Sequence, residues 1–100
     1  MAKVLFSVQY DILPEKKDDY LKVVKELKAI INKEGLEAYA VYEIKGKPNS
    51  FNEVYTFASV EAYEAFDDNE DERLNILINK LGDMIVGSTK YQTLVELNTN

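Results

Sequence analysis

The fold is decided by the stretch FNEVYTFASV at residues 51–60, where a strand leads into a helix. Residues 51–58 present two alternating sets of side chains, and most of these side chains are aromatic or β-branched, which is typical of a half-buried strand. Ser59 then stands directly before Val60 and offers a hydroxyl that can cap the first turn of a helix. We therefore expect a strand over Phe51–Ala58 and a helix that begins at Val60.

The residues before this stretch predict a hairpin, a helix and a first strand. Ala38–Ile44 is a mostly apolar run, and residues 46–50 are rich in turn formers, so 38–44 should pair with 51–58. Lys3–Ile12 alternates with the period of two that a strand requires. Between Pro14 and Gly35 we expect a helix, since proline favours the first turn and glycine favours the end.

The residues after the stretch predict an interrupted helix and a final strand. Like charges crowd residues 67–72, and apolar side chains then return at three- and four-residue steps from Leu74 to Ile85. Gly87-Ser88 should end this helix, and the alternating residues Lys90–Leu97 predict the last strand.

This order of elements defines the fold class. It predicts one α+β domain over residues 1–97 with the ferredoxin-like order β-α-β-β-α-β, a four-stranded antiparallel sheet with its helices on one face, and a frayed tail at 98–100. The other face of the sheet would then be open. We expect this open face to carry apolar side chains such as Leu5, Tyr39 and Val41, and a second copy of the chain to cover it.

The composition excludes several classes of function. Eighteen acidic residues against twelve basic ones give a formal net charge of -6, which disfavours nucleic acid and anionic membranes as partners. Cysteine and histidine are absent, which excludes disulfides, thiolate nucleophiles, Cys/His zinc sites and histidine bases. The first apolar run, Val4–Val8, is too short for a signal peptide or a spanning helix, so a cytoplasmic location is expected.

Two segments carry a resemblance to a known family. Residues 51–55 and 59–66, with the closing strand at 91–96, resemble the antibiotic-biosynthesis-monooxygenase-like group of the dimeric α/β-barrel superfamily. The resemblance implies a dimeric barrel and a cofactor-free, monooxygenase-like activity on a small planar organic molecule. This chain has Phe66 where members of the group often carry histidine, and without histidine a haem role is not implied.

Glu53 and Tyr55 are the candidate catalytic residues. They are two residues apart in a predicted strand, so their side chains emerge from the same face. A carboxylate beside a phenol in a cavity could act as general base in a cofactor-free oxygenation or an isomerisation. The simpler interpretation is an ion pair between Glu53 and a lysine such as Lys3 or Lys90 at a sheet edge.

The candidate substrate-binding residues are also strand residues. We expect Gln9, Tyr39, Asn52 and Gln92 to line a cavity at the dimer interface together with the catalytic pair. The alternative is that aromatic residues simply suit sheets and that polar ones lie on an exposed sheet face.

No metal site is predicted. Asp67, Asn69 and Asp71 alternate as in a calcium loop, but Glu72 stands where glycine is needed and Ile78 where a bidentate glutamate is needed. A solvated acidic turn is the expected structure.

Three functions stay open at this point. The chain is a cofactor-free monooxygenase-like enzyme, a non-catalytic ligand-binding or stress-response homodimer, or a structural or regulatory dimer without a cavity. The fold does not decide among them, but the interior does, because an enclosed pocket with convergent polar groups favours the first two.

Overall fold

The chain forms a four-stranded sheet with helices after the first and third strands. The computed structural model describes residues 2–31, 35–67 and 71–97. The elements in chain order are β1 (Val4–Ile12), the 3-10 helix η1 (Pro14–Lys16), α1 (Lys17–Ile30), β2 (Leu36–Glu43), β3 (Ser50–Phe57), α2 (Val60–Asp67), α3 (Glu72–Gly82) and β4 (Ile85–Val95). This is the predicted α+β order, with the second helical region divided in two.

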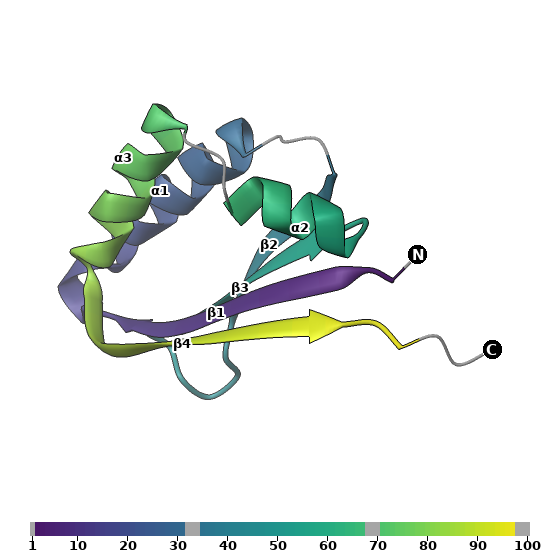
Figure 1. The fold of residues 1–100 in the computed structure, drawn as a ribbon. Helices are drawn as coiled ribbons and strands as arrows, with labels where there is room; N and C mark the ends of the chain where they lie inside the picture. The colour runs from purple at the N-terminus through teal and green to yellow at the C-terminus, as the bar shows by residue number, and fades with distance from the viewer. Residues whose placement is uncertain (1, 32–34, 68–70, 98–100) are drawn as a thin grey trace.

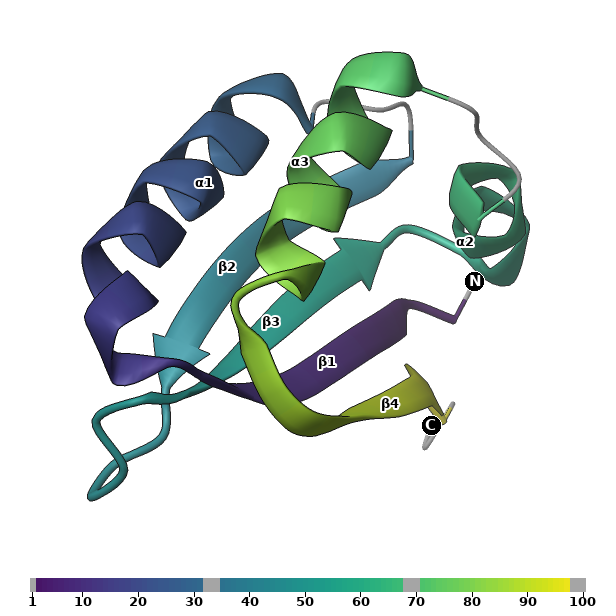
Figure 2. The ribbon, with the colours of Figure 1, turned by 90° about the vertical axis from the view of Figure 1, so that its left-hand side faces the viewer.

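The sheet is antiparallel throughout and has the strand order β2-β3-β1-β4. All three α-helices lie on one side of it, and the other side is bare (Figures 1 and 2). The strand order and the one-sided helix layer confirm the predicted ferredoxin-like fold class.

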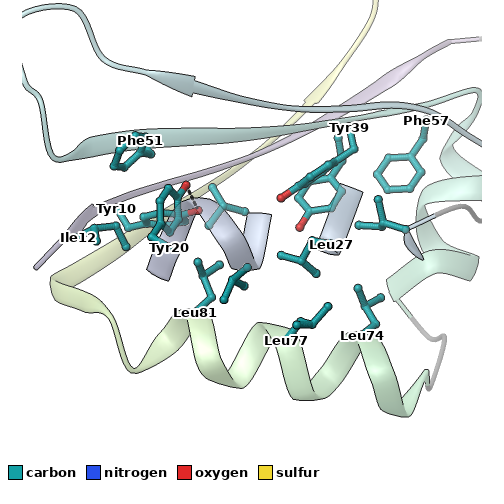
Figure 3. Close-up of a cluster of buried hydrophobic side chains, with 14 of the residues drawn as sticks. Tyr10, Ile12, Tyr20, Leu27, Tyr39, Phe51, Phe57, Leu74, Leu77 and Leu81 are labelled. Carbon is teal, nitrogen blue, oxygen red and sulfur yellow. Dashed lines mark hydrogen bonds between the residues drawn. The ribbon is translucent and has the colours of Figure 1, made fainter. Parts of the chain in front are cut away.

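The core lies between the sheet and the helices (Figure 3). Alternate residues of β1 and β3 face the helices. The helices contribute leucines at three- and four-residue spacing to the same core. The largest fully buried side chains are Tyr20, Phe57, Ile12, Leu27 and Val4. Helix α1 therefore contributes an aromatic and an aliphatic anchor to the same layer as the two central strands.

Side chains cap the helices that follow β3. Ser59 Oγ accepts a hydrogen bond of 3.1 Å from the backbone N–H of Ala62, which confirms the predicted cap. At α3, Asp71 accepts from the N–H of Leu74 at 3.2 Å. The calcium-like pattern is not described in full, because Asn69 lies outside the described residues.

Two predicted boundaries of the first helix are wrong. Pro14 opens the short 3-10 helix rather than the α-helix, which begins at Lys17. The helix ends at Ile30, ahead of Gly35, and residues 32–34 lie outside the described residues, as do 98–100 of the predicted tail.

The predicted start of the last strand is also wrong. Helix α3 ends at Gly82, and β4 begins at Ile85 and runs through Gly87-Ser88. Strand pairing explains the difference, because Ile85 lies opposite Ile12 and the N–H of Leu13 donates to Met84 at 2.9 Å. The register between β1 and β4 then shifts between Gln9 and Asp11, which accommodates the extra residues.

Two side chains of β2, those of Tyr39 and Val41, lie on the opposite side of the sheet from the one predicted. Tyr39 pairs with Tyr55 and Val41 pairs with Glu53, so both lie on the helix side rather than on the open face. Leu5 does lie on the open face, opposite Leu94. No helix within the described ranges is long and apolar enough to cross a membrane.

Candidate functional site

Glu53 is a carboxylate enclosed in the core of the domain. It lies in the middle of β3 with only 2% of its surface exposed. Among the described residues, the ion pairs join Lys3 to Glu37 and Lys17 to Glu43, so Glu53 has no basic partner there. A buried charge without a cation requires compensating hydrogen bonds. The predicted alternative of a surface ion pair for Glu53 is therefore wrong.

Three tyrosine hydroxyls supply those hydrogen bonds. Tyr10 donates to Oε1 at 2.5 Å, while Tyr39 and Tyr55 donate to Oε2 at 3.0 and 2.9 Å. The donors come from β1, β2 and β3 because Glu53 pairs with Val8 on one side and Val41 on the other. Tyr10 and Tyr39 each lie two residues along the neighbouring strand, a diagonal distance that a long side chain spans.

A fourth phenol extends the network from helix α1. The hydroxyl of Tyr20 lies 2.8 Å from that of Tyr10 (Figure 3), and Tyr20 is fully buried. A phenol has one proton, and Tyr10 gives its proton to Glu53, so Tyr20 is the donor to Tyr10. The direction of the chain is thus Tyr20 to Tyr10 to Glu53, and each bond polarises the next.

The electrostatics keep these phenols protonated. Burial, followed by the negative charge of Glu53, raises the pKa of Tyr10, Tyr39 and Tyr55 well above the ordinary value of 10.0. Burial also raises the pKa of Tyr20, although its hydrogen bond with Tyr10 acts in the opposite direction. The four side chains consequently remain hydrogen-bond donors at neutral pH.

A cavity of about 210 Å³ opens beside this network. Residues of β1, β3, α3 and β4 line it, and Tyr10, Glu53 and Tyr55 are among them. Its walls are mainly apolar and aromatic: Phe6, Val8, Ile78, Leu81, Ile85 and Tyr91. Among the described residues, no lysine or arginine lines it. A cavity of about 150 Å³ holds a benzene ring, so this one is large enough for a small planar molecule.

The structure brings together half of the predicted site. Glu53, Tyr55 and Tyr39 share one hydrogen-bond network. Tyr10 and Tyr20, which complete it, were not among the predicted site residues. The signal for Tyr10 was its place on the alternating apolar face of the first strand, but Tyr20 looked like any other member of a helical stripe.

The polar half of the predicted site lies elsewhere. Gln9 and Asn52 are paired across β1 and β3, and Gln92 lies opposite Ser7, so all four project from the open face. Asn52 Oδ1 accepts a hydrogen bond of 2.7 Å from Ser7 Oγ. Within one chain, Gln9, Asn52 and Gln92 cannot line the cavity of Glu53, because the sheet separates the two sets.

Within the described ranges, no group of three or more acidic side chains is placed to share a metal ion. The polar side-chain atoms of the site belong to one carboxylate, the phenols around it and the hydroxyl of Thr89 in the cavity lining. Such a set can bind a hydrogen-bond donor and accept a proton from it.

Comparison with known proteins defines the class of fold. No family model matches the chain. No curated protein matches it either. A conserved protein from Methanosarcina mazei is similar over 94% of this chain and 92% of its own, with 15% identity and a TM-score of 0.82. A candidate antibiotic biosynthesis monooxygenase from Caulobacter crescentus is similar over 97% and 92%, with 16% identity and a TM-score of 0.82.

A third similar structure has a described activity. It is SnoaB from Streptomyces nogalater, a cofactor-independent oxygenase in a single-site variant, with 11% identity, coverage of 97% and 95%, and a TM-score of 0.79. The chain therefore shares its fold with solved structures described as antibiotic biosynthesis monooxygenases. The resemblance inferred from residues 51–66 is confirmed at the level of the fold.

Proposed function

We propose that the chain is a cofactor-free, monooxygenase-like enzyme that acts on a small planar organic molecule in the cavity beside Glu53. One observation carries the proposal: a buried carboxylate, held by three phenols and by no cation among the described residues, lines a mainly apolar cavity. Ionisable groups in such surroundings are enriched at catalytic sites. SnoaB, which has the same fold, is described as a cofactor-independent oxygenase, and this supports an oxygenase over an isomerase.

The carboxylate has room for one more partner. Two carboxylate oxygens offer about four acceptor positions. Tyr39 and Tyr55 occupy the two on Oε2, and Tyr10 occupies one on Oε1. The position left on Oε1 can receive an acidic O–H or C–H of a substrate. Glu53 is then the general base, and the phenols hold its orientation and its charge.

The proposed reaction needs no external reductant. It has the form R₂CH₂ + O₂ → R₂C=O + H₂O, in which the substrate supplies all the electrons that reduce oxygen. Glu53 takes the first proton, and the electron pair left on carbon reacts with dioxygen. Loss of the second hydrogen and cleavage of the O–O bond then give the carbonyl and water. Glu53 itself is buried, which keeps its carboxylate away from bulk water.

An oxygen electrode tests this proposal directly. Wild type is incubated with one- and two-ring hydroquinones and hydroxyarenes, and oxygen uptake is compared with the spontaneous rate. Glu53→Gln should lower the catalysed rate by about 100-fold or more, the usual contribution of a general base. Glu64→Gln, which changes an exposed glutamate of α2, is the matched control.

The result also separates the alternative functions. Ligand binding without oxygen uptake would favour the non-catalytic ligand-binding or stress-response protein. A chain that binds none of these molecules would favour a structural role.

We further propose that the open sheet face is covered by a second copy of the chain. This face carries Leu5 opposite Leu94 and Val54 opposite Ser7, together with the polar residues Gln9, Asn52 and Gln92. Burial of such a surface against its two-fold copy would stabilise both domains. The cytoplasmic location stays a prediction from the sequence.

A further inference from the structure

One of the four glycines has no evident structural reason to be glycine. Gly35, Gly46 and Gly87 adopt positive φ angles, which other residues rarely tolerate. Gly82 does not; it is the last residue of helix α3, and Asp83 after it is also right-handed helical. Gly82 is therefore not the left-handed residue that commonly ends a helix, and alanine would suit its backbone better.

Packing does not require glycine at this position either. Outside its two chain neighbours and the backbone of its own helix, a Cβ atom added at Gly82 would meet no atom within 4 Å. At Gly35 the same construction brings the new atom to 2.5 Å from the Cβ of Ala62. The space beside Gly82 is thus open.

Gly82 is an exposed residue that also lines the cavity of Glu53. It lines the cavity together with Ile78 and Leu81 of the same helix. Residues four apart lie on the same face of a helix, and a side chain at 82 would lean back toward Ile78. Tyr91 of β4 lines the same cavity; it is 69% exposed and stacks on Phe6 with ring centres 6.1 Å apart.

We infer that Gly82 is a specificity-determining residue: its missing side chain keeps the α3 side of the cavity open, so that larger rings can reach Glu53. The inference rests on the proposed function of the cavity as the substrate site. Alanine at position 82 would stabilise the helix, whereas glycine leaves room for the ligand. Glycine at this position therefore favours function at a cost in stability.

Binding of two rings of different size tests the inference. Dissociation constants of phenol and 1-naphthol are measured by titration calorimetry for wild type, Gly82→Ala and Gly82→Leu. We expect Gly82→Ala to weaken 1-naphthol about tenfold, the effect of one methylene-sized change in a pocket, and phenol much less. Gly82→Leu should weaken both. Asn79→Ala, an exposed change on α3 outside the cavity lining, should alter neither.

Thermal melting separates this effect from misfolding. Gly82→Ala should melt at the same temperature as wild type or a few degrees higher, because alanine favours the helix. Unchanged binding of 1-naphthol by Gly82→Ala, or an equal loss for both ligands, would overturn the inference. Failure of wild type to bind either ligand would overturn it together with the proposed site. Binding without oxygen uptake would remove only the oxygenase and leave the role of Gly82 standing.

Discussion

The hydroxyl of Tyr10 donates a hydrogen bond of 2.5 Å to Oε1 of Glu53, so a phenol of the first strand holds a buried carboxylate of the third. Tyr20 donates to the same phenol at 2.8 Å, so α1 is joined to the site as well. Because of this contact, the stability of the sheet depends on the charge state of Glu53 and of the phenols around it.

Tyr10→Phe should lower the free energy of unfolding by about 1.5–3 kcal/mol, the range for a hydrogen bond to a charged group. In the background of Glu53→Gln the same change should cost less, since the charge is no longer present. Urea denaturation of the four proteins of this double-mutant cycle measures the coupling. Tyr42→Phe, at an exposed tyrosine with 58% of its surface accessible, is the control. Equal losses in both backgrounds would show that Tyr10 and Glu53 are not coupled.

High pH should unfold the domain steeply. The folded-state pKa values of Tyr10, Tyr20, Tyr39 and Tyr55 are raised above 10.0, so the folded chain keeps protons that the unfolded chain releases. Their contribution is fully present below pH 10.0 and is lost as the pH rises above it, by about 1.4 kcal/mol per tyrosine and pH unit. Near-ultraviolet tyrosinate absorbance should therefore rise together with the loss of helical circular dichroism. Ionisation of all the tyrosines with the helices intact would contradict this.

Truncation of Tyr55 should be far more damaging than truncation of an exposed tyrosine. Its ring contacts Phe6, Tyr39 and Phe66 at centroid distances of 5.6, 4.9 and 5.8 Å. Tyr55→Ala should therefore lower the free energy of unfolding by about 3–5 kcal/mol, as for other large aromatic truncations in cores. Tyr42→Ala should stay within about 0.5 kcal/mol of wild type. A similar midpoint in urea for the two variants would contradict the packing described for Tyr55.

A charge on the open sheet face should dissociate the proposed dimer. Leu94 and Leu21 are exposed to 43% and 49% in the single chain, on the open face and on α1 respectively. Sedimentation of wild type should give a dimer of the 11.5 kDa chain, Leu94→Lys a monomer, and Leu21→Lys a dimer. A wild-type monomer, or equal behaviour of the two variants, would exclude the open face as the interface.

Gly35 should be less replaceable than Gly46. Both have φ angles near the same value, +88° and +86°, so alanine strains the backbone similarly at each. Only at Gly35 does the new Cβ collide, at 2.5 Å from the Cβ of Ala62 in α2. Gly35→Ala should therefore lower the melting temperature clearly more than Gly46→Ala. Equal shifts would mean that α2 yields without loss of stability.

Much of the fold was predictable because it depends on local patterns. The alternation at 51–58 and the helical spacing of Leu74, Leu77 and Leu81 identify their elements. The boundary at Ile85 was not predictable from spacing, because a strand residue that continues an apolar helical pattern is distinguished only by its pairing with Ile12.

The sequence by itself determined that Glu53 and Tyr55 share a face, since side chains alternate along any strand. Only the tertiary structure decided which face that is, and it is the helix side. It also decided the register, in which Val8 and Val41 flank Glu53 and so bring Tyr10 and Tyr39 within reach of one carboxylate. Contacts between strands depend on pairing and packing across the whole sheet, which no local spacing encodes. For the same reason, Gln9, Asn52 and Gln92 are equally polar strand residues in the sequence but lie on the opposite side of the sheet from the cavity.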